Sequence, residues 1–287
     1  MADITRVAVV TGANKGIGRA IVKHLLQRGY KGHVLLTARN EALGKQTVEE
    51  LTKECGTAPV FHQLDVNDSA SVDKLRDFLK TTYGGLDVLV NNAGIAFKQD
   101  STAPFAQQAE ETVNTNYFGI LRVCHALYPL LRPHARVVHV SSSCGHLSKI
   151  PSSALRARFA APDLTEDQLT ALANEFVAAA KAGTNKEDGW GTSAYNVSKV
   201  LVTALCILQQ RQFDADQRAD LIVNAVHPGY VDTDMTSHKG PLTPEEGADA
   251  PAWLAMLPPS HADNPKGQYV WKDRKVTPWN SESHPPI

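Results

Sequence analysis

The glycine-rich loop near the start of the chain constrains the fold more than any other feature. An apolar strand is expected over 6–11, and the segment 12–18, Gly-Ala-Asn-Lys-Gly-Ile-Gly, leads from it into an apolar helix. A β-branched strand of this kind is typical of a central parallel strand covered on both faces. Glycines permit a close approach to a ligand, and a helix start offers N–H groups to phosphate. The pattern predicts a dinucleotide-binding unit, and the alternative is an ordinary glycine-rich turn.

The same alternation of strand and helix continues along the chain. Strand patterns recur over 33–37, 60–64, 86–90, 136–140, 220–226 and 267–271, and helical patterns lie between them over 41–55, 69–83 and 104–131. Strands that alternate with helices indicate a parallel sheet with helices on both faces. We therefore expect one α/β domain over 1–287, a doubly wound, Rossmann-like parallel sheet.

One segment interrupts the alternation. No strand pattern occurs over 146–190, and helical periodicity covers 164–182, with Thr165 and Gln168 spaced as a capping box. We expect a helical insertion within the domain at about 146–190, and a mobile tail over 278–287.

Charge and hydropathy exclude several function classes. The chain has 29 basic and 30 acidic residues, a formal net charge of −1, and no long run of either sign, so the electrostatic footprint of a nucleic-acid-binding protein is missing. No stretch approaches the ~20 apolar residues that span a bilayer. Residues 1–6 lack a signal-peptide pattern. These features predict a cytoplasmic protein with a small-molecule partner, bound neither to nucleic acid nor to a membrane.

The cysteines favour neither a disulfide nor a metal. They are scattered, form no CxxC pair and lack the histidine spacings of a metal site; their positions are Cys55, Cys124, Cys144 and Cys206. We expect free thiols and no metal ion.

Tyr195 and Lys199 form the candidate acid catalyst. Residues four apart share a face of the helix predicted by the apolar run after 199, so the phenol and the ammonium point the same way. A neighbouring cation is expected to lower the pKa of a phenol from about 10, so that it can pass its proton to a developing alkoxide. Taken alone, the spacing is weak, because most such pairs are structural.

Polar segments follow several of the expected strands. Asp65-Val66 follows the third strand, 91–94 (Asn-Asn-Ala-Gly) the fourth, 141–145 (Ser-Ser-Ser-Cys-Gly) the fifth and 227–229 (His-Pro-Gly) the sixth. Ligands of doubly wound sheets bind outside the carboxyl ends of the strands. These four segments are therefore candidate parts of one site.

Two cations indicate which dinucleotide binds. Where a site that prefers NAD carries a carboxylate for the ribose 2′-hydroxyl, this chain has Arg39 after the second strand, and Lys15 lies in the glycine loop. Together they could bracket a 2′-phosphate, which favours NADP(H) over the alternative of two solvated surface cations.

Asn116 lies inside an apolar helix, where an amide side chain is normally unfavourable, so it has either a packing or a chemical task.

These residues resemble the signatures of the short-chain dehydrogenase/reductase family over nearly the whole chain. The segments 11–18 (Thr-Gly-xxx-Gly-x-Gly) and 91–94, a serine before the catalytic helix, the Tyr195-xxx-Lys199 pair and Pro228-Gly229 occur in the family's order. The long insertion, Asn14-Lys15 and the segment 187–190 resemble the monomeric NADPH-dependent carbonyl reductases of animals. Monomeric plant reductases with a similar insertion are the nearest alternative.

The resemblance implies a role for each catalytic position. Ser142, three residues before Gly145, would orient the substrate carbonyl, with Ser141 or Ser143 as alternatives. Tyr195 would be the general acid, and Lys199 would lower its pKa and hold the nicotinamide ribose. Asn116 would fix a water that relays protons to Lys199.

It also implies the binding positions. Asp65 and Val66 would contact the adenine, Asn92 and Gly94 its ribose and the backbone, and Val231 and Thr233 the nicotinamide amide. The full set of implied NADPH/NADP+ contacts is Gly12, Asn14, Lys15, Gly16, Ile17, Gly18, Arg39, Asp65, Val66, Asn92, Gly94, Tyr195, Lys199, Pro228, Gly229, Val231 and Thr233. Besides Ser142 and Tyr195, the expected substrate-lining residues are Cys144, Trp190, Tyr230 and Met235, each with an alternative as ordinary core or rim.

The expected substrate-lining residues would form an apolar, polarizable pocket, which suits aromatic ketones and quinones. Many animal carbonyl reductases have Cys before the Pro-Gly pair and Trp after it. This chain departs from that pattern with His227 and Tyr230, which bears on thiol chemistry and on the substrate range. The function expected is reduction of aldehydes, ketones and quinones by a monomer, since the insertion would block family pairing. The alternatives are an NADP-dependent dehydrogenase of one alcohol, such as a steroid or prostaglandin, and a non-catalytic NADP(H)-binding module.

Overall fold

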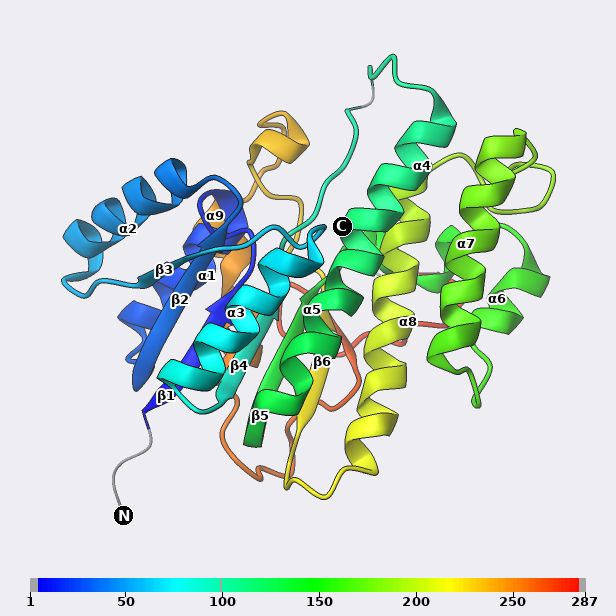
Figure 1. The fold of residues 1–287 in the computed structure, drawn as a ribbon. Helices are drawn as coiled ribbons and strands as arrows, with labels where there is room; N and C mark the ends of the chain where they lie inside the picture. Colours follow the sequence, from blue (N-terminus) through cyan, green and yellow to red (C-terminus); the bar gives the residue numbers. More distant parts are fainter. Residues whose placement is uncertain (1–4, 99, 284–287) are drawn as a thin grey trace.

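The fold is a seven-stranded parallel sheet between two layers of helices (Figure 1), seen in a computed structural model that describes residues 5–98 and 100–283. The strand order is β3-β2-β1-β4-β5-β6-β7, so the chain winds outward twice from β1 and β4. The strands are β1 (Arg6–Val10), β2 (Gly32–Ala38), β3 (Val60–Gln63), β4 (Leu86–Asn91), β5 (Leu131–Val140), β6 (Ile222–Val226) and β7 (Tyr269–Val270). This confirms the expected doubly wound α/β fold.

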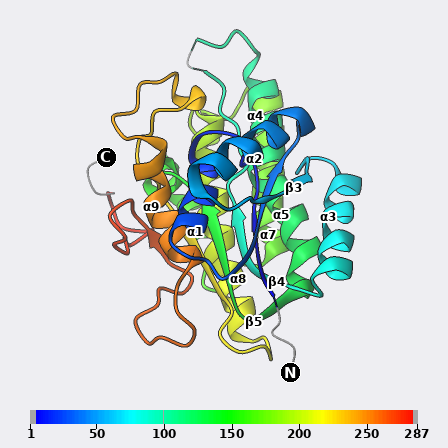
Figure 2. The same cartoon turned by 90° about the vertical axis from the view of Figure 1, so that its left-hand side faces the viewer.

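The alternation of side chains along β1 explains why the sheet has a core on each face. Val7 and Val9 belong to one apolar cluster and Ala8 and Val10 to the other, because successive strand residues point to opposite faces. Figure 2 shows α1 and α9 on one side of the sheet and α3 and α5 on the other. The helices that cover the sheet are α1 (Gly16–Gln27), α2 (Glu41–Cys55), α3 (Ser69–Thr82), α4 (Phe105–Val113), α5 (Gly119–Leu127), α8 (Ala194–Asp214) and α9 (Pro244–Ala255).

The insertion holds α6 (Ser153–Phe159) and α7 (Glu166–Ala182), and α7 packs against α4 and α8. The expected capping box is present: the Thr165 N–H donates to Gln168 Oε1 at 2.9 Å and the Gln168 N–H to Thr165 Oγ1 at 3.2 Å. α7 and α8 lie side by side at one end of the molecule (Figure 1).

Three expectations differ from the structure. The helix expected over 104–131 is divided by a π-helical turn, Asn114–Phe118, between α4 and α5. β7 is shorter than the expected 267–271, because the Trp271 N–H bonds to the Lys275 carbonyl in a turn. The tail expected to be mobile from 278 is anchored at its second residue, since Trp279 is buried and donates from Nε1 to the Gly145 carbonyl at 2.7 Å. Residues 284–287 lie outside the described residues.

No helix within residues 5–98 and 100–283 is long and apolar enough to cross a membrane.

Candidate active site

A cleft of about 690 Å³ lies at the carboxyl ends of the strands. It spans the point between β1 and β4 where the strand order reverses, which is where ligands bind in open α/β sheets. The expected cofactor residues that line it are Gly12, Asn14, Lys15, Gly16, Ile17, Gly18, Arg39, Asp65, Val66, Asn92, Gly94 and Thr233. Those outside its described lining are Tyr195, Lys199, Pro228, Gly229 and Val231.

The glycine loop takes a conformation that other residues would resist. Gly12 and Gly16 have φ of +62° and +55°, and a Cβ on Gly18 would lie 2.5 Å from the Gly12 carbonyl oxygen. α1 starts here without a side-chain cap or an acidic residue in its first turn. The positive end of the helix dipole therefore faces the cleft, and no carboxylate of the helix neutralises it. This arrangement fits a pyrophosphate.

Asn92 ties two loops of the cleft together. Its Nδ2 donates to the carbonyls of Thr11 at 2.9 Å and Gly12 at 3.0 Å. In return, Thr11 Oγ1 accepts from the N–H groups of Asn92 and Ala93, each at 3.0 Å. The amide expected at a ribose thus holds the glycine loop against the segment after β4.

Lys15 and Arg39, the two cations expected at a 2′-phosphate, both border the cleft and are exposed. Lys15 Nζ pairs with Asp234 Oδ2 at 2.6 Å, and His238 Nε2 lies 3.2 Å from the other oxygen of Asp234. Sequence reasoning missed Asp234 and His238, since a surface acid in a loop carries no signal for its partner. The cations fit a phosphate, but Asp234 competes for Lys15.

Tyr195 and Lys199 share one face of α8, whose N-terminus is capped by Ser193. Lys199 Nζ donates to the Val140 carbonyl at 2.8 Å and lies 5.6 Å from the centre of the Tyr195 ring. Burial lowers the pKa of Lys199 to about 8, against an opposing effect of Cys144.

The pKa of Tyr195 differs from the sequence expectation. Burial and the nearby Cys144 raise it, while a hydrogen bond with Ser142 lowers it by less. The reason is geometric: Lys199 is turned to the Val140 carbonyl, and no hydrogen bond joins its Nζ to the phenol within the described residues. The phenol therefore holds its proton at neutral pH and, in this structure, is a weaker acid than an ordinary tyrosine.

The three serines after β5 have different surroundings. Ser141 is buried and bonds to Thr203 Oγ1 at 2.8 Å, and Ser143 is buried as well. Ser142 is half-buried, accepts from the Cys144 N–H at 3.2 Å, and is near enough to Tyr195 to lower the pKa of the phenol. The geometry favours Ser142 among the three.

Asn116 is fully buried on the π-helical turn. Its Oδ1 accepts from the Ile95 N–H at 2.8 Å, and its Nδ2 donates to the Ile95 carbonyl at 2.9 Å and to Ser198 Oγ at 3.0 Å. A Cβ on Gly94 would lie 3.1 Å from Asn116 Oδ1 and 3.8 Å from Lys199 Nζ. Asn116 thus links the cleft wall to α8 beside Lys199.

Among the described residues, Met235 is the only one of the four further substrate positions that lines the cleft, and Trp190 lies elsewhere. It is buried and packs against Phe176 and Phe159, with ring centres 5.6 and 6.3 Å away, so its indole fills the core of the insertion. Met235 lines the cleft and is exposed, as is Tyr230, and Cys144 is half-buried beside Ser142. Val231 is buried and pairs with Leu242.

Comparison with known proteins places this chain among reductases. Residues 6–174 match the model of the short chain dehydrogenase family. Carbonyl reductase [NADPH] 1 of Rattus norvegicus is 48% identical over 95% of this chain and 98% of its own length. Carbonyl reductase [NADPH] 1 of Bos taurus is 47% identical over 97% of this chain and 100% of its own length. The structure of salutaridine reductase from Papaver somniferum is 33% identical, covers 92% of this chain and 99% of its own, and has a TM-score of 0.82.

Proposed function

Because this chain belongs to the short chain dehydrogenase family, we propose that it is an NADPH-dependent carbonyl reductase, which converts aldehydes, ketones and quinones to alcohols. The observation that carries the proposal is the meeting of Ser142, Tyr195 and Lys199 at the carboxyl edge of the sheet. Gly94, in the wall of the cleft, lies beside Lys199, so the three side chains adjoin the nucleotide cleft.

NADPH fits the cleft by charge and by backbone shape. The glycine loop and the start of α1 would hold the pyrophosphate, and Lys15 and Arg39 the 2′-phosphate. Asp65 and Val66 would contact the adenine, Asn92 and Gly94 its ribose, and the segment from Pro228 and Gly229 through Val231 to Thr233 the nicotinamide. When bound, the cofactor supplies the hydride that the carbonyl carbon accepts.

The protein's own side chains would orient the substrate and supply the proton. Ser142 would donate a hydrogen bond to the substrate oxygen, and Tyr195 would pass its proton to that oxygen as negative charge develops. Lys199, with a pKa of about 8, is mostly charged at neutral pH and would stabilise the phenolate that remains. Asn116, beside Lys199, is proposed to hold a water that returns a proton.

We also propose that the protein is a cytoplasmic monomer. The family's expected pairing surface is the outer face of the helix that carries the catalytic tyrosine, here α8, and α7 packs against α8 and α4. Cys144, Tyr230 and Met235 are proposed to line the substrate side.

NADPH oxidation at neutral pH with a quinone and an aromatic ketone tests the function. We expect turnover with NADPH, much slower turnover with NADH, and collapse in Tyr195→Phe while NADPH still binds. Turnover only when one alcohol is oxidised would indicate the dehydrogenase alternative. NADPH binding without any turnover would indicate the non-catalytic module.

A further inference from the structure

Three side chains from the last third of the chain bond to the backbone of the loop that carries Ser142. The Tyr269 hydroxyl donates to the Ser142 carbonyl. The Ser143 N–H donates to His227 Nδ1 at 2.9 Å, and Trp279 Nε1 donates to the Gly145 carbonyl at 2.7 Å. Three of the four residues in the loop 142–145 are thus fixed from outside.

The three side chains are themselves well anchored, because each is buried: His227 and Tyr269 are 2% exposed and Trp279 is 8% exposed. They reach the loop from separate places, the end of β6, β7 and the segment after β7. A hydrogen bond between buried groups restricts both partners strongly, since breaking it leaves a polar atom unsatisfied.

The loop has little to hold it by itself. It is a single 3₁₀ turn, Ser143–Gly145, with backbone bonds from the Gly145 N–H to the Ser142 carbonyl at 2.8 Å and from the His146 N–H to the Ser143 carbonyl at 3.4 Å. Its other internal bond runs from the Cys144 N–H to Ser142 Oγ at 3.2 Å. Such short turns depend on their surroundings for a fixed conformation. The orientation of the Ser142 hydroxyl therefore depends on the outside contacts.

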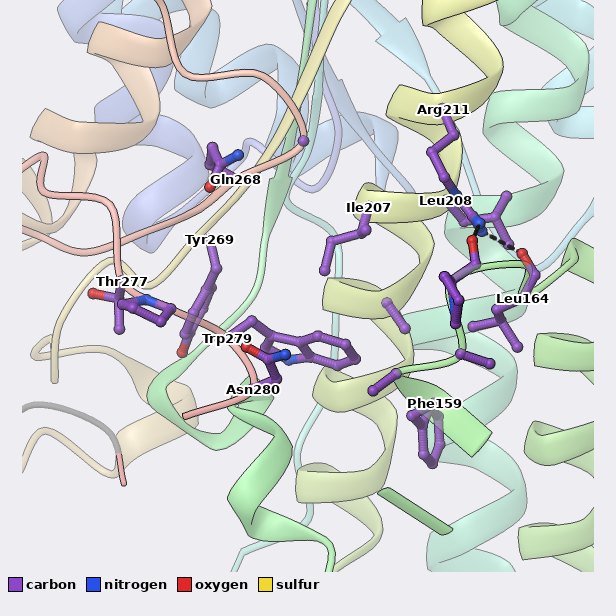
Figure 3. Close-up of a pocket in the computed structure, with 16 residues that line it drawn as sticks. Phe159, Leu164, Ile207, Leu208, Arg211, Gln268, Tyr269, Thr277, Trp279 and Asn280 are labelled. Atoms are coloured by element: carbon purple, nitrogen blue, oxygen red, sulfur yellow. Dashed lines mark hydrogen bonds between the residues drawn. The ribbon is translucent and has the colours of Figure 1, made fainter. Parts of the chain in front are cut away.

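Trp279 makes its contact beside a second cavity. A space of about 470 Å³ lies between the C-terminal segment, the end of α6 and the face of α8 that carries Ile207, and Tyr269 and Trp279 line it. Figure 3 shows the indole of Trp279 reaching from that segment toward α8. Because there is open space on this side, a smaller ring at 279 fits without overlap and removes the Nε1–H donor together with part of the indole's apolar contact.

We propose that His227, Tyr269 and Trp279 are positioning residues that aim the Ser142 hydroxyl at the substrate oxygen. The proposal rests on the proposed function for the role of Ser142. If the proposal holds, turnover needs the polar atoms of these rings, namely His227 Nδ1, the Tyr269 hydroxyl and Trp279 Nε1, and not only their apolar surfaces.

The test compares substitutions that remove one hydrogen bond each, made in the wild-type chain and in Ser142→Ala. Tyr269→Phe and Trp279→Phe remove a donor, and His227→Gln moves the acceptor away from the Nδ1 position, which His227→Asn retains. Matched controls are Tyr128→Phe, which removes a hydroxyl bonded to Gln209, and Trp253→Phe, whose indole packs on Arg274.

We expect each of the first three variants to lower kcat about tenfold, the effect of losing one buried hydrogen bond. The NADPH Kd and the Tm should change little, His227→Asn should retain most of the activity, and both controls should resemble the wild type. In Ser142→Ala the same substitutions should cost less than about twofold, because coupled residues are not additive.

A second readout does not need turnover. Amide hydrogen exchange of 142–145 should be faster in the three variants than in the controls. Equal losses of kcat with and without Ser142, or unchanged exchange, would overturn the inference. If the wild-type protein reduces no carbonyl, the proposed function fails, while the exchange rates still decide whether these rings hold the loop.

Discussion

Lys199 Nζ donates a hydrogen bond to the Val140 carbonyl at 2.8 Å, one residue before the serines of the site begin. This contact ties α8 to the end of β5. It also holds the ammonium beside the Tyr195 ring, 5.6 Å from its centre, in a buried position. Lys199, the lysine proposed to act beside Tyr195, is thus positioned by the sheet as well as by its own helix.

The pH dependence of reduction should report Lys199. Burial lowers its pKa to about 8 from the ordinary 10.5, so its charge is lost as the pH rises through about 8. We expect kcat/KM for carbonyl reduction to fall above that pH, measured from pH 6 to 10. Lys199→Arg should move the fall to higher pH if it remains active, and a flat profile would mean that the charge is not needed.

The same shift has a consequence for stability. Between pH 8 and 10.5 the unfolded chain retains the Lys199 proton that the folded chain has lost, so this residue raises the free energy of unfolding as the pH rises through that window. Urea denaturation of the wild type and Lys199→Met at pH 7 and 10 checks this. The variant should gain stability mainly at pH 7.

The Lys15–Asp234 pair should govern affinity for NADPH rather than stability. Both side chains are more than half exposed, and such pairs contribute little to folding. Lys15→Ala should weaken NADPH binding about tenfold or more and leave NADH unaffected, because it removes a charge-assisted phosphate contact. Asp234→Asn should strengthen NADPH binding, since it frees the ammonium.

Fluorescence titrations with NADPH and with NADH measure the dissociation constant of each nucleotide. Lys45→Ala is the matched control, because Lys45 is also an exposed lysine paired with a carboxylate, Glu41, and lies outside the lining of the cleft. Weaker NADPH binding in Asp234→Asn would show that the carboxylate supports the site and does not compete for Lys15.

Asp220 should make the fold sensitive to acid. Burial raises its pKa, but hydrogen bonds from the Ser260 N–H, Arg136 and His134 outweigh burial and lower it to about 2. Its stabilisation is therefore complete above the ordinary value of 3.8 and is lost as the pH falls from there toward 2. Arg136 is 1% exposed and pairs with Asp220 at 2.8 Å.

Asp220→Asn leaves that guanidinium without its charge partner and should cost about 3–5 kcal/mol at pH 7. Urea denaturation from pH 2 to 6 measures both effects. The difference between wild type and variant should shrink below pH 4, and a constant difference would point to lost packing instead.

Trp190 should matter for stability and not for substrate. Trp190→Ala should lower the free energy of unfolding by about 3–5 kcal/mol, because the indole fills the core between α6 and α7. Trp190→Phe should cost less and leave KM for an aromatic ketone unchanged. A raised KM in the stable Phe variant would place Trp190 at the substrate after all.

Local patterns allowed much of the fold to be predicted. The bounds 41–55 of α2 and the capping box of α7 follow from apolar period and cap chemistry, which depend on residues close in sequence. The π-helical turn at Asn116 could not be predicted, because it depends on contacts with Ile95 and Ser198, far along the chain.

The alternation of strands and helices, the glycine loop and the spacing of Tyr195 and Lys199 could be predicted from the residues, since these depend on backbone propensity and helical period. Four features emerged only in the folded chain: the direction of the Tyr195 pKa shift, the pairing of Lys15 with Asp234, the burial of Trp190 and the anchoring of the Ser142 loop by Trp279. The physical reason is that desolvation, ion pairing and buried hydrogen bonds depend on which distant segments meet in space, and helical or strand periodicity carries no information about those partners.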